Sequence, residues 1–227
     1  MSDYISQVVE RYKSFMKINS FPFFTTEYYE LEEGGTYSHI AKAEYSIPDN
    51  KHKLLLTRNI CIPKWVLFHE LTHMLDMERY RNGDYNHDFC LSGYMEYHAA
   101  QVELVKIVGA ETVDTPVSFS MMDKIDELHE MIQQYVDNKL KMAQKLMESH
   151  DQKEKIDGIN ALFNFFGLKS ICSMYATDYV DNYTYQSASM LISSCLFTMT
   201  RVFMTGWIED VDKAICLYSN VIAEVLN

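Results

Sequence analysis

The sequence has no run of basic residues and no long uninterrupted apolar segment, and each absence argues against a class of protein. Its 227 residues carry a net charge of −12, whereas nucleic acids and anionic membranes both require a basic surface. The most hydrophobic stretch, residues 188–207, is interrupted by serine, threonine and arginine, which favours a buried helix over a membrane span. The N-terminal residues contain no apolar core of the kind that a signal peptide needs. We therefore expect no nucleic-acid partner and no membrane association.

The number and spacing of the cysteines predict no disulfide pairing. The five cysteines are scattered, odd in number and without C-x-x-C spacing, which argues against a disulfide framework and against a zinc finger. They predict reduced thiols in a cytoplasmic protein. The sequence also contains no internal repeat and no low-complexity segment. Hydrophobic residues make up 48% of the chain, enough for a substantial core in one large domain or two small ones.

One segment, residues 63–83 (PKWVLFHELTHMLDMERYRNG), carries the residue types typical of a site. Pro63 suits the first turn of a helix, and Asn82-Gly83 is a helix stop signal. His69 and His73 are four residues apart, so on a helix both imidazoles lie on one face. Two neutral imidazoles at this spacing suit Zn²⁺, which binds nitrogen ligands at about 2.0–2.1 Å in tetrahedral geometry.

Glu70 completes the pattern H-E-x-x-H. Its position beside the first histidine places it on the open side of a metal ion, where it can take a proton from a water whose pKa zinc lowers to about 7. The remaining circumference of this helix is mostly apolar, which predicts that the helix is buried. The alternative is that His69 and His73 are core residues that hydrogen-bond to the backbone. We favour the metal site.

Zinc requires a third protein ligand, and the next helix offers candidates. Glu96 lies 23 residues beyond His73, far enough for a second helix to return across the first. On that helix, for which Ser92 is the predicted cap, Glu96 and Glu103 share a face with small alanines between them, which permits close packing. We expect Glu96 to be the third ligand, with Glu103 as the alternative ligand or as a group that orients a histidine.

Two more polar residues fall near this site. Asp76 lies three residues after His73 on the same stripe, and we expect it to hydrogen-bond a ligand, although it remains a candidate ligand. His98 points about 160° away from Glu96 at about 100° per residue, so packing or a substrate contact is its expected role.

The rest of the chain divides near residue 114. Before it, the periodicity predicts a helix over 3–18, strands over 23–31, 36–47 and 52–59, the helix of residues 63–83, and a polar loop over 84–90 before the Glu96 helix. After it, we expect a long helix from 122 to 147 with a capping box at Ser120, and a helix over 151–166 that Gly167 ends. Further helices are expected over 170–179, 187–204 and 207–226. This pattern predicts an α+β domain over 1–114 and a helical region over 115–227, which either packs on the first as one unit or binds a partner.

The segment from 36 to 103 resembles the ImmA/IrrE family of zinc metallopeptidases. The resemblance rests on the strand pair, on KLLLTRNICIPKWVLFHELTHMLD and on the E-x-x-A-A helix that starts at Glu96. It implies a zincin-like, gluzincin-type fold with His69, His73 and Glu96 as metal ligands and Glu70 as the catalytic residue. Members are cytoplasmic proteins of bacteria or mobile elements, and the resemblance implies a protein substrate such as a transcriptional repressor.

The expected activity is zinc-dependent hydrolysis of peptide bonds, in which Glu70 deprotonates the attacking water and protonates the leaving amine. An oxyanion donor is expected nearby, and we take Tyr97 as the first choice. The other candidate donors are Tyr80, Tyr85, Tyr94 and His98.

Two alternatives remain open. A metal-stabilised, non-catalytic protein would use a fourth ligand such as Asp76 to close the site and would use the helical half to bind a regulator. Hydrolysis of a non-peptide amide would use the same zinc chemistry. The ligand set would also accept Mn²⁺, Co²⁺, Ni²⁺ or Fe²⁺.

Overall fold

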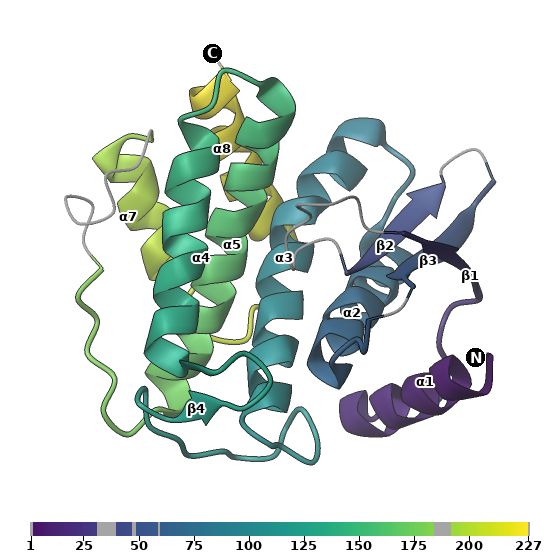
Figure 1. The fold of residues 1–227 in the computed structure, drawn as a ribbon. Coiled ribbons are helices and arrows are strands. Elements are labelled where there is room, and N and C mark those ends of the chain that lie inside the picture. The colour runs from purple at the N-terminus through teal and green to yellow at the C-terminus, as the bar shows by residue number, and fades with distance from the viewer. Residues whose placement is uncertain (1, 31–39, 47–48, 59, 184–191, 227) are drawn as a thin grey trace.

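The computed structural model describes residues 2–30, 40–46, 49–58, 60–183 and 192–226. Within these residues the protein is α+β and mostly helical, with seven helices and a three-stranded sheet, which confirms the predicted fold class at this level (Figure 1). None of the described helices is long and apolar enough to cross a membrane. The elements in chain order are α1 Ser2–Met16, β1 Phe24–Tyr29, β2 Ala41–Ser46, β3 Lys51–Thr57, α2 Lys64–Tyr80, α3 Tyr85–Ile107, β4 Lys124–Ile125, β5 Glu130–Met131, α4 Ile132–Met147, α5 Gln152–Tyr175, α7 Ser194–Phe203 and α8 Val211–Leu226.

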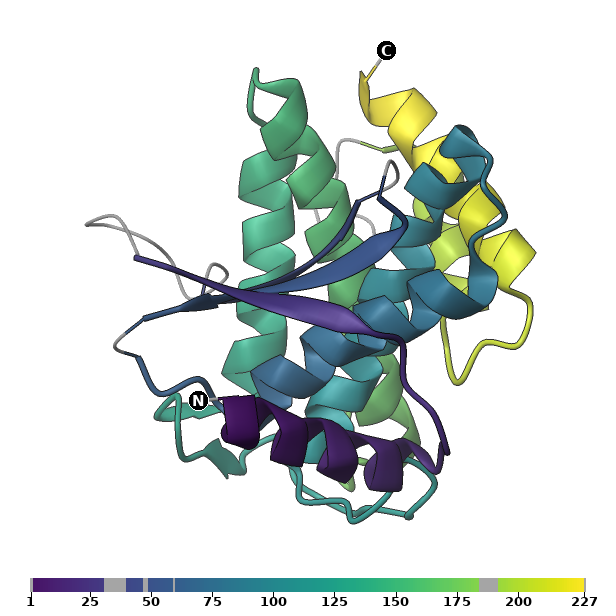
Figure 2. The same ribbon diagram turned by 90° about the vertical axis from the view of Figure 1, so that its right-hand side faces the viewer.

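The sheet has the strand order β1-β3-β2, with β1 parallel and β2 antiparallel to the central strand. In β3 the side chains of His52, Leu54 and Leu56 are buried while Lys53 and Leu55 between them are more exposed, as expected when one face of a strand packs on a core. In Figure 2 the strands run across the helices, with α1 below them. Strand β2 contacts α2, and this contact brings an edge strand alongside the H-E-x-x-H helix.

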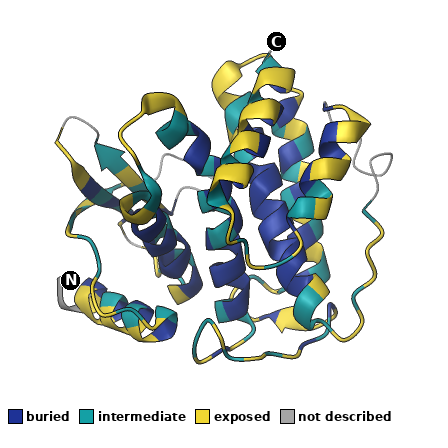
Figure 3. Ribbon diagram, turned by 180° about the vertical axis from the view of Figure 1, so that it is seen from behind, coloured by how far each residue is buried: buried dark blue, intermediate teal, exposed yellow. Residues whose placement is uncertain are grey.

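The helices form successive layers away from the sheet. Helix α2 packs on α3, and α3 packs in turn on α5 and α8, so α3 lies between the two halves of the chain (Figure 1). Helices α3 and α5 are buried along most of their length, as the dark blue ribbon in Figure 3 shows. Gly167 of α5 permits their close approach, because a Cβ atom there would overlap the carbonyl oxygen of Tyr97 and come within 2.9 Å of the Ala100 Cβ. The buried apolar residues of both halves belong to one cluster.

The prediction of a polar loop over residues 84–90 is wrong. Helix α3 already begins at Tyr85, and its N-cap is Asp84, whose side chain accepts a hydrogen bond from the backbone N–H of His87. Ser92, the expected cap, lies well inside the helix. Asp is as good a cap as Ser, and it stands directly after the Asn82-Gly83 stop.

Two predicted boundaries in the helical region are also wrong. Helix α4 begins at Ile132 rather than near 122, because residues 124–131 form the short hairpin β4–β5. Helix α5 runs through Gly167 to Tyr175 and joins two helices that were expected to be separate. Gly167 is a helix terminator by local propensity, but here the close packing against α3 requires it. The expected strand over 36–47 and helix over 187–204 fall partly outside the described residues, and their described parts form β2 and α7.

Candidate metal centre

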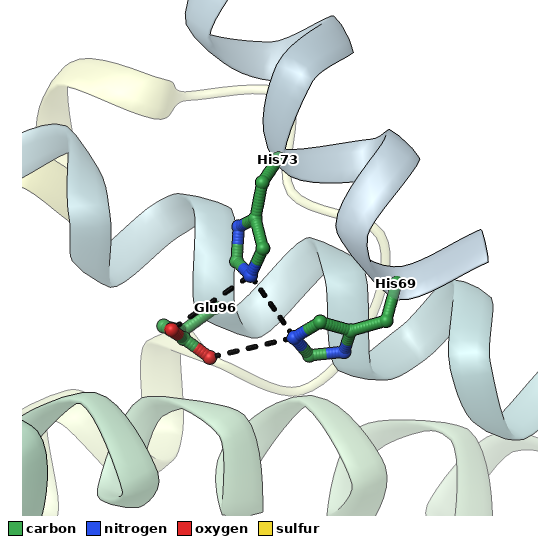
Figure 4. Close-up of side chains that lie close together, drawn as sticks. All are labelled: His69, His73 and Glu96. Atoms are coloured by element: carbon green, nitrogen blue, oxygen red, sulfur yellow. Dashed lines mark hydrogen bonds and ion pairs between the residues drawn. The ribbon is translucent and has the colours of Figure 1, made fainter. Parts of the chain in front are cut away.

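Three side chains from α2 and α3 converge on one point. His69 and His73 lie one turn apart on α2, and Glu96 faces them from α3 (Figure 4). The Nε2 atoms of the two histidines are 3.0 Å apart. Glu96 Oε2 lies 3.7 Å from Nε2 of His69, and Glu96 Oε1 lies 3.7 Å from Nε2 of His73. Among the described residues, this is the one group of His, Cys, Asp and Glu side chains with the spacing of a metal site.

The spacing fits a zinc ion. Bonds of about 2.0–2.1 Å in tetrahedral geometry place any two ligand atoms about 3.4 Å apart. The two Nε2 atoms are 3.0 Å apart, and each lies 3.7 Å from a different oxygen of Glu96, so the separations are close to that value on either side of it. A hydrogen bond between the two imidazoles would engage only one proton and would not explain the carboxylate that faces both rings. The residues therefore fit a metal ion, and the described part of the chain could supply three ligands to it.

Glu103 does not join this group but lies on the far side of His69. Its Oε2 is 2.8 Å from Nδ1 of His69, at an angle outside that of a regular hydrogen bond, while its Oε1 accepts a hydrogen bond from the hydroxyl of Tyr135 on α4. A carboxylate at Nδ1 holds the ring proton there and leaves Nε2 free to bind a metal. Of the roles left open for Glu103, the geometry supports the orienting one.

A residue of the helical region holds the Glu96 side chain in a similar way. Asn164 on α5 is buried, and its Nδ2 donates a hydrogen bond to Glu96 Oε2 at 3.4 Å. Sequence reasoning assigned no chemistry to the helical half and so missed both Asn164 and Tyr135. The available signal was weak: each is a polar residue in an apolar helical pattern, which must find a partner when buried.

Asp76 is fully buried beside His98, with Oδ2 2.8 Å from Nδ1 of that ring. It lies outside the three-residue group. Its other oxygen and Nδ1 of His73 are both buried without a hydrogen-bond partner among the described residues. The expected roles of His98, packing or a substrate contact, did not include this polar contact with Asp76, and a hydrogen bond between Asp76 and a metal ligand stays a prediction.

Glu70 lies beside the metal group without belonging to it. Its Oε2 accepts a hydrogen bond of 2.6 Å from the backbone N–H of Ala43 on β2, so the edge strand fixes its carboxylate. Burial raises the pKa of Glu70 to about 7, although His69 and the Ala43 N–H both oppose the shift. A carboxylate that is half-protonated near neutral pH can both accept and return a proton.

Without a metal ion, the pKa values of the three side chains depend on their burial and on their charges. Burial lowers the pKa of His73 to about 4, so this imidazole is neutral at pH 7 and able to bind a metal. Burial also opposes a charge on His69, but Glu103 and Glu96 outweigh it and raise the pKa of His69. Burial opposes ionisation of Glu96 as well, yet His73 and His69 hold its pKa near 2. Metal binding at neutral pH would therefore displace a proton from His69.

Tyr97 is not brought to the metal group. Its side chain is 0% exposed, and its hydroxyl donates a hydrogen bond of 2.6 Å to the backbone carbonyl of Gly206. The phenol is thus engaged in packing between α3 and the segment before α8, and the oxyanion role expected for Tyr97 does not fit this geometry. Among the other candidates, Tyr94 is buried against Tyr80, and Tyr85 is 70% exposed.

No protein-family model matches the chain, and neither the curated proteins nor the solved structures include a significant match to it. The fold and the site define an α+β protein with a His-His-Glu group that could hold a metal ion.

Proposed function

We propose that this protein is a zinc-dependent hydrolase of peptide bonds. The observation that carries the proposal is the placement of Glu70, whose carboxylate is fixed by the Ala43 N–H beside a group of three candidate ligands. Structural zinc sites use four protein ligands, whereas catalytic sites use three and keep one position open. The described residues offer three.

In the proposed mechanism, zinc supplies a Lewis acid that lowers the pKa of water and polarises the scissile carbonyl. Glu70 accepts the proton of the attacking water and then delivers it to the leaving amine. The Ala43 N–H keeps the Glu70 carboxylate in place for both transfers. Glu103 and Asn164 hold His69 and Glu96 in the orientation that leaves their metal-facing atoms free.

Membership of the zincin-like ImmA/IrrE family remains part of this proposal. It is supported by the order of the elements, since an edge strand lies beside the H-E-x-x-H helix and the next helix supplies Glu96. A regulatory protein as substrate follows from that resemblance alone.

A metal-stabilised interaction protein is the second candidate. Two observations favour it: Glu70 Oε2 already has a structural partner in Ala43, and the metal group is braced by helices of the C-terminal half. In this case the metal would join the two halves of the chain, and Glu70 would serve the packing of β2 on α2.

Substitution of Glu70 separates the two candidates. We expect His69→Ala and Glu96→Ala to lose the metal, measured as zinc per chain by mass spectrometry. Glu70→Gln should retain about one zinc per chain and the thermal stability of the wild type, but lose about a hundredfold or more in the rate of peptide cleavage. The matched control is Glu78→Gln, a glutamate at the far end of α2 that contacts His52 instead. Unchanged cleavage of a protein substrate by Glu70→Gln would leave the interaction protein as the better account.

A further inference from the structure

A cavity of about 240 Å³ opens directly beside the metal group. It is lined by the edge strand β2, by His52 of β3, by α2 and by the first three turns of α3, and it is partly open to solvent. Its wall includes His73, one of the candidate ligands, and Ala43, whose N–H holds Glu70. The cavity therefore adjoins the metal group on the side of His73.

The lining is mostly apolar and adaptable. Met74, Met77 and Met95 contribute thioethers from two helices, and Phe89 and Tyr45 contribute aromatic rings. Met74 lies on the core side and is 1% exposed. Unbranched methionine side chains adjust to the shape of a bound apolar group, which suits a cavity that accepts several related side chains.

The size of the cavity limits its occupant. Pockets for drug-sized ligands and cofactors have volumes of about 300–1,000 Å³. At about 240 Å³ this cavity is below that range and is large enough for one bulky side chain.

The charges around the cavity limit its occupant further. Asp88 and Glu44 are among the described residues that line it, and none of these is a lysine or arginine, while Arg81 lies outside the lining with its guanidinium over the Tyr45 ring. Burial opposes the ionisation of Asp88, but the N–H groups of Asn82 and Gly83 and the ring of His87 outweigh it, so the pKa of Asp88 is lowered. An acidic side chain in the cavity would meet these carboxylates and an apolar wall, and both disfavour it.

We propose that this cavity binds one bulky apolar side chain of a peptide, such as leucine, methionine or phenylalanine, next to the bond held at the metal group, and rejects acidic side chains. The inference rests on the proposed function and assigns a substrate preference to it. The occupant is the side chain of a peptide because the cavity joins the metal group on one side and the edge strand β2, a surface suited to an extended chain, on the other.

Binding of hydroxamates to the zinc-loaded protein tests the inference without catalysis. Three probes share the zinc-chelating group and differ in the attached side chain, which is methyl, isobutyl or carboxymethyl. Burial of a leucine-sized group contributes about 1.5–3 kcal/mol, so the isobutyl probe should bind about tenfold or more tightly than the methyl probe. The carboxymethyl probe should bind no more tightly than the methyl probe.

Two variants test whether the cavity causes the preference for the isobutyl probe. Met77→Lys should abolish the advantage of the isobutyl probe and favour the carboxymethyl probe, while the volume-conserving Met77→Leu should keep the wild-type order. Zinc content and thermal unfolding of both variants establish that each is folded and loaded.

Equal affinity for all three probes would overturn the cavity assignment and leave the metal site intact. Failure of every probe to bind the zinc-loaded protein would overturn both the cavity assignment and the open metal site of the proposed function.

Discussion

Each nitrogen of His69 faces its own carboxylate. Nε2 faces Glu96 within the metal group, and Nδ1 faces Glu103, which in turn accepts from Tyr135. The two nitrogens thus have different roles. The carboxylate at Nδ1 sets the position of the ring proton and the basicity of Nε2, and Nε2 faces the metal position. Through Glu103 and His69, Tyr135 would act on a bound metal ion as a positioning residue.

Removal of the Tyr135 hydroxyl should weaken the metal site. In Tyr135→Phe the Glu103 carboxylate loses a buried hydrogen bond, and its hold on His69 becomes less defined. Loss of such supporting groups costs about tenfold to a hundredfold in metal affinity, and we expect a zinc dissociation constant about tenfold higher. Competition with a chromogenic chelator measures it.

Tyr183→Phe is the matched control for this substitution. Its hydroxyl also bonds a carboxylate, that of Asp137 on α4, but neither group touches the metal ligands. Equal losses of zinc affinity in the two variants would show that general packing, and not the connection to His69, accounts for the effect of Tyr135.

The pH dependence of the metal-free protein follows from two opposed groups. The pKa of His73 is lowered from 6.5 to about 4, so its contribution to stability is present above pH 6.5 and is lost as the pH falls toward 4. The pKa of Glu70 is raised from 4.5 to about 7, so its contribution grows as the pH falls from 7 toward 4.5. The two shifts have similar size and opposite sign, and they offset each other.

We therefore expect the thermal midpoint of the metal-free protein to change little between about pH 7 and 5. Below about pH 4.5 it should fall, because Glu96, whose pKa is lowered to about 2 in the folded state, is then protonated in the unfolded state but not in the folded one. In Glu70→Gln the opposing group is gone, and the fall should begin near pH 6.5. Parallel curves for the two proteins, recorded by calorimetry, would contradict this account.

At the scale of the elements, the sequence predicted the parts whose signals are local. Pro63 and the apolar positions after it predicted α2, and the four-residue spacing of His69 and His73 predicted their shared face. The separation of Glu96 from His73 was compatible with a returning helix, and the structure brings the three residues together.

The parts that depend on contacts between distant elements could not be predicted. Gly167 has the local preference of a terminator, and only the approach of α3 explains why α5 continues through it. The choice between Glu96 and Glu103 depended on which nitrogen of His69 each one faces, and spacing along a helix does not contain that information. Asn164 and Tyr135 act across helices that are far apart in the sequence.

The crossing of α3 and α5 gives a prediction of its own. In Gly167→Ala the added methyl group overlaps the carbonyl oxygen of Tyr97, so the helices must separate. We expect a loss of about 1–3 kcal/mol or more in the free energy of unfolding, together with weaker zinc binding, because Asn164 on α5 moves away from Glu96. Denaturant titration and chelator competition measure the two effects.

Gly206→Ala is the control, because a Cβ there would meet only the Met174 sulfur at an ordinary 3.7 Å. It should change neither quantity. Loss of stability in Gly167→Ala with unaltered zinc affinity would show that the position of α5 does not influence the metal group.

At the scale of the whole molecule, the two halves share one core. The buried face of α3 toward α5 and α8 would be exposed if the chain stopped at residue 114. We expect a fragment of residues 1–114 to lack cooperative unfolding and to bind zinc more weakly than the full chain, as judged by circular dichroism, amide NMR spectra and chelator competition. A fragment with well-dispersed spectra and full zinc affinity would establish residues 1–114 as an independent domain.

The candidate ligands precede Asn164 in the sequence, and this order has a consequence during synthesis. The three ligands are complete at Glu96, but Asn164, which holds Glu96, follows 68 residues later. At about 5–20 residues per second, a ribosome needs about 3–14 s to cover that interval. For those seconds the nascent chain presents the three candidate ligands without Asn164, so a metal ion captured early would meet a more adaptable site than the one the finished protein offers.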